Sequence, residues 1–163
     1  MLTKNICVKK ISLNDKENCR VMKSVLNSWF QDPKLLNLVS PKSKYPFFFN
    51  DWKKKYKMND TETLIITNEN WIIGHLSLNL KMKGKINMFH LIIDPKFQRI
   101  GLATKLICEV EKIASNIKKR TITLNVLKSN HKAISLYEKL GYKLNRKKSY
   151  YLNYYKDVEV SCL

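Results

Sequence analysis

Glycine, proline and cysteine are scarce in this sequence, with four of each in 163 residues. No stretch rich in glycine, proline or serine offers a linker, and no internal repeat is visible, so we expect a single domain over residues 1–163. The cysteines contain no C-x-x-C pair, which argues against a zinc site and against a disulfide framework. We therefore expect no metal. Cys108 lies on the helix expected to start near Gly101, so we expect it to be buried and reduced.

Long apolar runs are missing as well. No window approaches the ~18 uninterrupted apolar residues that a membrane-spanning helix requires. The N-terminal segment MLTKNICVKKIS contains no apolar core of the length found in a secretory signal. With 44% hydrophobic and 27% charged residues, the composition is that of a globular protein. These features predict a cytoplasmic protein without a membrane partner.

Acidic residues are also few. The chain has 13 Asp and Glu against 31 Lys and Arg, which gives a formal net charge of +18. Such an excess raises the affinity for polyanions without specifying which polyanion. It also follows from a composition rich in Lys, Asn and Ile throughout, so the charge by itself assigns no function.

Hydrophobic periodicity predicts an α/β chain in the order β-α-α-β-β-β-α-β-α-β-β. The expected strands are residues 5–12, 62–68, 71–83, 86–94 and 121–129, then a closing pair within 142–163 that turns around Asn153. The expected helices are residues 16–30, 47–58, 102–117 and 130–141. Residues 31–46 contain three prolines and are expected to form an irregular connection.

The segment 92–107, IIDPKFQRIGLATKLI, places a turn between a strand and a helix. A helix N-terminus presents free N–H groups and a partial positive charge of roughly half an electron, which favours phosphate. Gly101 and Ala103 keep bulk away from those amides, and Arg99 and Lys105 add charge at the mouth. The turn matches neither the P-loop nor the G-x-G-x-x-G pattern. Taken alone, it is equally consistent with a plain strand–helix connection.

Two segments resemble the motifs of the GNAT superfamily of acetyl-CoA-dependent N-acetyltransferases. Residues 93–106, IDPKFQRIGLATKL, are similar to its motif A: an apolar strand end, D-P, an aromatic residue, then Q/R-x-x-G-x-G/A and a helix. Residues 125–142, NVLKSNHKAISLYEKLGY, are similar to its motif B. The resemblance covers essentially the whole chain, which looks similar to the ribosomal-protein N-terminal, spermidine and amino-sugar acetyltransferase branches. It implies an α/β (α+β) fold with a mixed, mostly antiparallel sheet of about seven strands, splayed in the middle, and about four helices on its faces.

The resemblance also implies acetyl-CoA as the cosubstrate. The main-chain amides from Gln98 to Thr104 would hold its pyrophosphate, and the end of the preceding strand would pair with its pantetheine arm. The implied cofactor-binding residues are Leu91, Ile93, Gln98, Arg99, Ile100, Gly101, Leu102, Ala103, Thr104 and Asn130. Arg99 and Ile100 depart from the family pattern, which has glycine and then a basic residue there. Tyr137 would be the general acid for the departing thiolate; the alternative for Tyr137 is a core aromatic on an amphipathic helix.

The general base is harder to assign. Many relatives carry a Glu on the strand before motif A or on the one before motif B, where this chain has Met88 and Asn125. His90 is the titratable side chain on the strand before motif A, and its usual pKa suits proton abstraction near neutrality. Strict alternation would place Met88, His90 and Ile92 on one face of that strand. We take His90 as the candidate base; a structural histidine and a water chain are the alternatives, and the other two histidines are weaker candidates.

The sequence leaves the amine acceptor open among an amino sugar, a protein N-terminus and a polyamine-like amine. The positive charge slightly favours an acceptor that carries phosphate, such as a nucleotide-linked amino sugar, or a protein amine presented near RNA. The tyrosines of the last hairpin either wall its pocket or pack on one another. Monomer and homodimer are both open.

Two rival functions remain at this point. The first is a nucleic-acid-binding protein that uses KKKYK, residues 53–57, and the Tyr/Lys-rich C-terminal segment. The second is a GNAT fold that binds CoA without turnover, prompted by the absence of the usual Glu.

Overall fold

Seven strands, five α-helices and one 3₁₀ helix are the regular elements of the part of the chain that the computed structural model describes, residues 5–56 and 60–159. In chain order they are β1 (Ile6–Ile11), α1 (Lys16–Trp29), α2 (Pro33–Val39), α3 (Phe49–Lys54), β2 (Thr61–Asn68), β3 (Trp71–Asn79), β4 (Lys85–Ile93), the 3₁₀ helix η1 (Pro95–Phe97), α4 (Leu102–Asn116), β5 (Thr121–Leu127), α5 (His131–Lys139), β6 (Lys143–Lys147) and β7 (Tyr151–Asp157).

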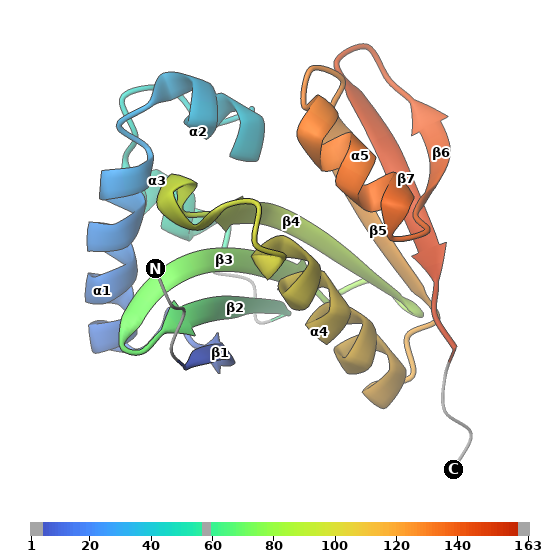
Figure 1. Cartoon of the computed structure of the whole chain (residues 1–163), viewed down its shortest axis with the longest axis horizontal. Coiled ribbons are helices and arrows are strands. Elements are labelled where there is room, and N and C mark those ends of the chain that lie inside the picture. The colour runs from blue at the N-terminus through green and yellow to red at the C-terminus, as the bar shows by residue number, and fades with distance from the viewer. Residues whose placement is uncertain (1–4, 57–59, 160–163) are drawn as a thin grey trace.

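The strands form one sheet in the order β1-β2-β3-β4-β5-β7-β6. Every neighbouring pair is antiparallel except β4 and β5, which are parallel. These two strands pair only where Lys85–Met88 lies beside Thr121–Leu124, and beyond that point they diverge (Figure 1). The mostly antiparallel sheet with a splay in the middle is therefore confirmed, and the divergence opens the sheet at its centre.

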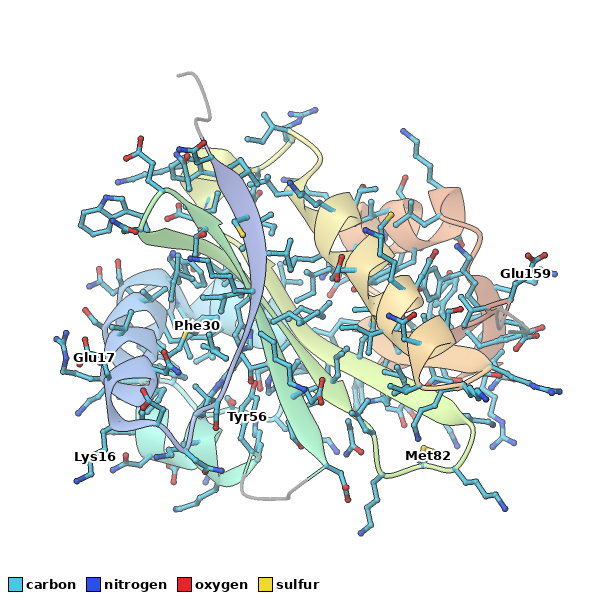
Figure 2. All side chains as sticks on the ribbon, turned by 90° about the horizontal axis from the view of Figure 1, so that it is seen from below. Lys16, Glu17, Phe30, Tyr56, Met82 and Glu159 are labelled. Atoms are coloured by element: carbon cyan, nitrogen blue, oxygen red, sulfur yellow. The ribbon has the colours of Figure 1, made fainter. Side chains whose placement is uncertain are left out.

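The two faces of the sheet are covered by different helices. Helices α4 and α5 pack on one face, where Leu106, Ile107 and Val110 are fully buried against the strands. Helices α1, α2 and α3 cover the other face, where Met22 and Trp52 are buried. Figure 2 shows α1 and α4 on opposite sides of the sheet. Each face thus has its own apolar core, and the splay between β4 and β5 lies between the two helical groups.

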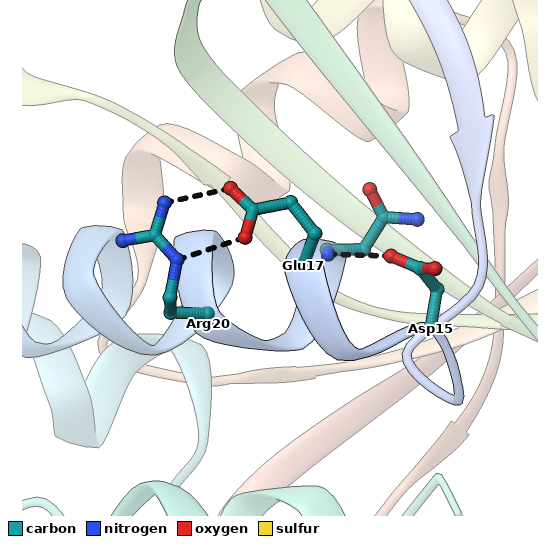
Figure 3. A network of polar contacts seen from close by, with 4 residues as sticks. Asp15, Glu17 and Arg20 are labelled. Carbon is teal, nitrogen blue, oxygen red and sulfur yellow. Dashed lines mark hydrogen bonds and ion pairs between the residues drawn. The ribbon is translucent and has the colours of Figure 1, made fainter.

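Local sequence signals explain where the helices begin. Asp15 caps α1, since its Oδ1 accepts a hydrogen bond from the main-chain N–H of Asn18 at 2.8 Å (Figure 3). Glu17, in the first turn of the same helix, forms a two-bond ion pair with Arg20 on the exposed side. Because this pair is exposed, it adds little to stability, and α1 is held mainly by its buried face.

The segment 31–46, expected to be irregular, contains the helix α2. Asp32 accepts a hydrogen bond from the main-chain N–H of Lys34 at 2.8 Å, and Pro33 occupies the first turn, where its missing N–H costs nothing. The prolines that suggested a break therefore mark a helix start. The neighbouring helix α3 is shorter than the predicted 47–58, and residues 57–58 lie outside the described residues.

Two further expectations are wrong. Asn153 does not turn the last hairpin: it lies within β7, where its Nδ2 donates to the main-chain oxygen of Leu124 and to Oδ1 of Asn125. These cross-strand bonds satisfy an amide that would otherwise favour a turn. Cys108 is exposed rather than buried, because the buried face of α4 is formed by other residues, among them Ile107 and Val110.

Candidate active site

A cavity of about 530 Å³ opens between the end of β4, helix α2 and the N-termini of α4 and α5. Nine of the ten predicted cofactor-binding residues line it: Leu91, Ile93, Gln98, Arg99, Gly101, Leu102, Ala103, Thr104 and Asn130. The tenth, Ile100, does not line it, and its side chain is 54% exposed. The structure therefore brings the two sequence motifs together around one cavity.

The N-terminus of α4 opens into this cavity without a side-chain cap. Its N-cap residue, Gly101, has φ 83°, a left-handed conformation that glycine adopts without strain. A Cβ added at Gly101 would meet no protein atom within 4 Å, so the approach to the helix end is open. In contrast, the side chains of Asp15, Asp32 and Asn130 cap α1, α2 and α5. The first amides of α4 are thus left for a ligand.

Arg99, which stands where the family pattern has glycine, has a backbone conformation that favours glycine. Its φ is 69°, in the left-handed region where a residue with a side chain is strained by about 1 kcal/mol. A glycine at this position would adopt the same backbone without that strain. The turn is held to the strand end by Gln98, whose Nε2 donates to the main-chain oxygen of Ile93 at 3.1 Å. The turn therefore has a left-handed backbone at Arg99 that glycine would adopt without strain, and it carries a cationic side chain there.

Lys105 does not stand at the mouth of the cavity as expected. Its Nζ donates to the main-chain oxygen of Ile6 at 3.2 Å, which directs the side chain to β1. On the opposite wall, Asn130 accepts a hydrogen bond from the N–H of Ala133 at 3.3 Å through Oδ1. This cap occupies the amide oxygen of Asn130, so its nitrogen remains as the donor available to a ligand.

The cavity continues into a smaller one of about 70 Å³ that both catalytic candidates line. His90 and Tyr137 share this smaller cavity with Met88 and Asn125. The two cavities have five lining residues in common: Leu38, Val39, Leu91, Asn130 and Ala133. The splay between β4 and β5 therefore forms a slot that leads from the end of α4 to His90 and Tyr137.

Tyr137 is buried in the α4–α5 face. Its ring packs against Tyr142 with centroids 5.9 Å apart in a T-shaped arrangement. Burial raises the pKa of Tyr137 above its usual range, because the phenolate would lose its solvation. The hydroxyl therefore stays protonated at neutral pH and is available as a proton donor.

His90 lies at a bulge in β4 that breaks the predicted alternation. Ser77 of β3 is opposite Phe89 and His75 is opposite Ile92, so β4 has one extra residue between these pairs. His90 has φ 54° at this point. Met88 and Ile92 consequently belong to the cores on opposite faces of the sheet, and the prediction that they share a face is wrong.

The side chains around His90 form a buried chain of hydrogen bonds. His75 Nδ1 lies 3.0 Å from the main-chain oxygen of His90, which can only accept, so His75 carries its proton on Nδ1. Its Nε2 then accepts from the hydroxyl of Ser77 at 3.4 Å. The Ser77 oxygen in turn accepts from Tyr56 at 2.7 Å, and the Tyr56 oxygen accepts from His90 Nδ1 at 2.8 Å. This order of donors leaves Nε2 of His90 without a proton.

His75 is fully buried and His90 partly buried, and both are neutral at neutral pH. Burial lowers the pKa of His75 to about 4, against its hydrogen bond to the main chain of His90. Burial also lowers the pKa of His90 well below 6.5, with smaller contributions from the charges of His75 and Lys55. The ring of His90 stacks on Trp52 with centroids 3.9 Å apart, which fixes its orientation.

On the far side of His90 the slot widens again. A cavity of about 330 Å³ is lined by His90, Asn125 and Tyr151 together with Lys42 and Lys55, and an adjoining one of about 390 Å³ shares Asn125 and Tyr151 with it. Of the hairpin tyrosines, Tyr151 thus walls a pocket. Tyr154 is instead buried and donates to Glu138 at 2.7 Å, while Tyr150 is 80% exposed.

Two groups of site residues were missed by the sequence analysis. Leu35, Leu38 and Val39 of α2 line the first cavity, and the Asp32–Pro33 start signal would have revealed their helix. Tyr56 and Ser77 of the hydrogen-bonded chain carry no local signal, since they reach His90 only through the fold.

The basic segment 53–57 does not present one cationic stripe. Lys53 donates to Sγ of Cys19 at 3.2 Å, Lys54 pairs with Asp51, and Lys55 turns to the 330 Å³ cavity. Lys57 lies outside the described residues. The nucleic-acid hypothesis therefore gains no support from the described part of this segment.

Comparison with known proteins agrees with this geometry. The sequence pattern of the family described as acetyltransferase (GNAT) family matches residues 24–142. The fold is similar to that of the PaiA N-acetyltransferase of Thermoplasma acidophilum in complex with coenzyme A (TM-score 0.73, 18% identity, 94% of this chain and 99% of the other). It is also similar to spermidine N-acetyltransferase of Vibrio cholerae in complex with CoA and spermine (0.73, 16%, 93% and 95%). A third similar structure is the ribosomal-protein-S18-alanine N-acetyltransferase of Escherichia coli (0.67, 14%, 98% and 96%).

At these identities the structural likeness establishes the fold. No curated protein sequence matches the chain. In residues 5–56 and 60–159, no helix is long and apolar enough to cross a membrane, and no three His, Cys, Asp or Glu side chains gather as a metal site.

Proposed function

Because the chain belongs to the acetyltransferase (GNAT) family, we propose that it transfers the acetyl group of acetyl-CoA to a primary amine by direct attack in a ternary complex. The observation that carries the proposal is the continuous slot between β4 and β5. It begins at the uncapped N-terminus of α4, passes His90 and Tyr137, and widens again into the cavity lined by Lys42, Lys55 and Tyr151. Two substrates can enter such a slot from its two ends and meet at its narrow middle.

The residues of the first cavity fit coenzyme A. The amides at the start of α4 and the guanidinium of Arg99 suit its pyrophosphate, and the apolar side chains of α2 and Leu91 suit the pantetheine arm. The end of β4 has no partner on β5, so its main chain is available to pair with the amides of that arm. The nitrogen of Asn130 donates from the opposite wall.

The reaction requires two proton movements. A C–N bond forms between the amine and the acetyl carbon while the C–S bond of acetyl-CoA breaks; the amine nitrogen loses a proton and the sulfur gains one. His90 Nε2 accepts the proton from the amine, and the Tyr137 hydroxyl donates to the sulfur. The two side chains line the same narrow cavity, one on β4 and the other on α5.

The proposal is tested by binding and turnover measured on the same preparation. Acetyl-CoA at 100 times its Kd should stabilise the protein by about 2.7 kcal/mol, seen as a rise in Tm. Release of the CoA thiol should then depend on an added amine, drawn from a panel of amino sugars, peptides and polyamines. Absence of CoA binding would refute the proposal, and binding without turnover on any amine would favour the inactive CoA-binding alternative.

Arg99 gives a prediction specific to this chain. Arg99→Gly keeps the left-handed backbone and removes the charge, so we expect the free energy of unfolding to change by less than about 1 kcal/mol. The affinity for CoA should fall about 5-fold, because one exposed charge-assisted contact to phosphate is lost. The matched variant Arg99→Lys keeps a cation and should retain most of the affinity in isothermal titration. An unaltered Kd in Arg99→Gly would limit Arg99 to its backbone role.

The cytoplasmic location and the choice between monomer and homodimer stay predictions.

A further inference from the structure

The acceptor side of the slot carries charge of one sign. Its two cavities, of about 330 and 390 Å³, are lined by five cationic side chains: Lys42, Lys55, Lys85, Arg146 and Lys148. Of the described residues, no aspartate or glutamate lines either cavity, and none of the five cations takes part in an ion pair. A polycationic amine would meet repulsion here without a compensating carboxylate.

Of the five cations, Lys55 is the one whose charge acts on His90. It lines the same cavity as His90, and its charge contributes to lowering the pKa of that histidine. Its Nζ donates to Oγ of Ser40 at 2.8 Å and to Oγ of Ser43 at 3.0 Å, which orient the ammonium without neutralising it. The pKa of Lys55 is lowered by its partial burial and by repulsion from the nearby charge of Lys42.

Two adjacent cations with no counter-charge suit a ligand that carries two negative charges. A phosphate monoester or a diphosphate supplies them, together with acceptor oxygens for the Lys ammonium groups and the Ser40 hydroxyl. A single carboxylate would neutralise only one of the two lysines. We propose that the amine acceptor is a small molecule that carries phosphate, which Lys42 and Lys55 bind. This inference rests on the proposed acetyl transfer and names the substrate class of the same site.

The arrangement also orders the acceptor relative to the reacting groups. With phosphate at Lys42 and Lys55, the rest of a sugar-sized molecule extends along Asn125 towards His90, since all four residues line one cavity. Neutralisation of Lys55 by the phosphate also removes one of the charges that lower the pKa of His90. Binding of the correct acceptor therefore makes the base stronger at the moment when it is needed.

The first test compares matched amines in an assay of CoA thiol release. Glucosamine and glucosamine 6-phosphate differ by the phosphate alone, a nucleoside-diphosphate-linked amino sugar tests the diphosphate source, and spermidine tests the polycation. We expect kcat/KM for at least one phosphate-bearing amine to exceed that for glucosamine about 10-fold, as for a charge-assisted contact. Equal rates for all sugars, or preference for spermidine, would overturn the proposal.

The second test assigns the lysines. Lys42→Ala and Lys55→Met should remove the preference for the phosphorylated sugar while leaving the Kd for CoA unchanged. Lys16→Ala, an exposed lysine on α1 with the same change in net charge, should leave the preference intact. A preference that survives both cavity variants would contradict the assignment.

A binding measurement keeps the inference separate from the acetyl-transfer proposal. Inorganic pyrophosphate is titrated into CoA-saturated protein, so that the first cavity is already filled. We expect Lys55→Met to weaken its Kd about 10-fold, and Lys16→Ala to leave it unchanged. If pyrophosphate binds in this way but no amine is acetylated, acetyl transfer fails and the anion site stands. If acetylation proceeds but Lys55→Met leaves the Kd for pyrophosphate unchanged, the inference fails while the acetyl-transfer proposal stands.

Discussion

Tyr137→Phe is expected to lower kcat for acetyl transfer about 100-fold, the effect of removing a general acid. Burial raises the pKa of Tyr137, so the wild-type hydroxyl remains protonated and can donate to the sulfur as it departs. The phenylalanine ring keeps the packing against Tyr142, so the Kd for CoA should stay within about 2-fold of wild type. Steady-state turnover and isothermal titration with CoA measure the two quantities.

Tyr142→Phe is the matched control for that variant. Tyr142 is as buried as Tyr137 and belongs to the same ring pair, but its hydroxyl has no hydrogen-bond partner in the described structure. Removing an unpaired buried hydroxyl should leave turnover unchanged and should not lower the free energy of unfolding. A similar loss of kcat in both variants would mean that the substitutions disturb packing rather than remove a proton donor. An unaltered kcat in Tyr137→Phe would mean that Tyr137 is a core aromatic without a catalytic role.

The open turn before α4 was predictable because its determinants are local. Gly101 and Ala103 lie in one short segment, and the requirement for an open helix N-terminus acts on consecutive residues. Helix α2 was equally local but was misjudged: Asp32 and Pro33 form a start signal, and the weight given to proline as a breaker concealed it. In this case a rule for helix interiors was applied to a helix terminus.

The surroundings of His90 were not predictable in the same way. The bulge depends on the register between β3 and β4, which alternation within one strand does not contain. Tyr56 follows α3, Ser77 lies on β3 and His90 on β4, so their hydrogen bonds join segments far apart in the sequence. Asn153 shows the same limit, since the cross-strand bonds that hold it in β7 outweigh its preference for turns.

The second large effect is expected at His90. His90→Asn keeps a donor near the position of Nδ1, so the hydrogen bond to Tyr56 can persist, and asparagine tolerates the observed φ of 54°. The variant lacks Nε2, and we expect kcat to fall about 100-fold through loss of the general base. Because the ring that stacks on Trp52 is lost, urea unfolding should show a free energy of unfolding lower by about 1 kcal/mol, with the fold retained. An unaltered kcat would favour a water chain and leave His90 a structural histidine.

The pH dependence distinguishes a partly buried, hydrogen-bonded base from an ordinary histidine. The pKa of His90 lies well below 6.5, so the side chain is unprotonated from pH 6.5 upwards. The ratio of wild-type to His90→Asn turnover cancels the titration of the amine and should be constant above pH 6.5. It should approach one only at lower pH, as His90 becomes protonated. A midpoint at or above 6.5 would contradict the buried, hydrogen-bonded assignment.

Tyr56→Phe tests whether the hydrogen-bonded chain sets the tautomer. Without the Tyr56 oxygen, the N–H at Nδ1 of His90 loses its acceptor, and the neutral ring gains by moving its proton to Nε2. The base would then present a proton instead of a lone pair, so we expect kcat to fall about 10-fold with the Kd for CoA unchanged. Tyr45→Phe removes an exposed hydroxyl that takes no part in the hydrogen bonds around His90, and it should leave kcat unchanged. Because Tyr56 does not line the slot cavities around His90, a loss confined to kcat would identify it as a positioning residue that acts through His90.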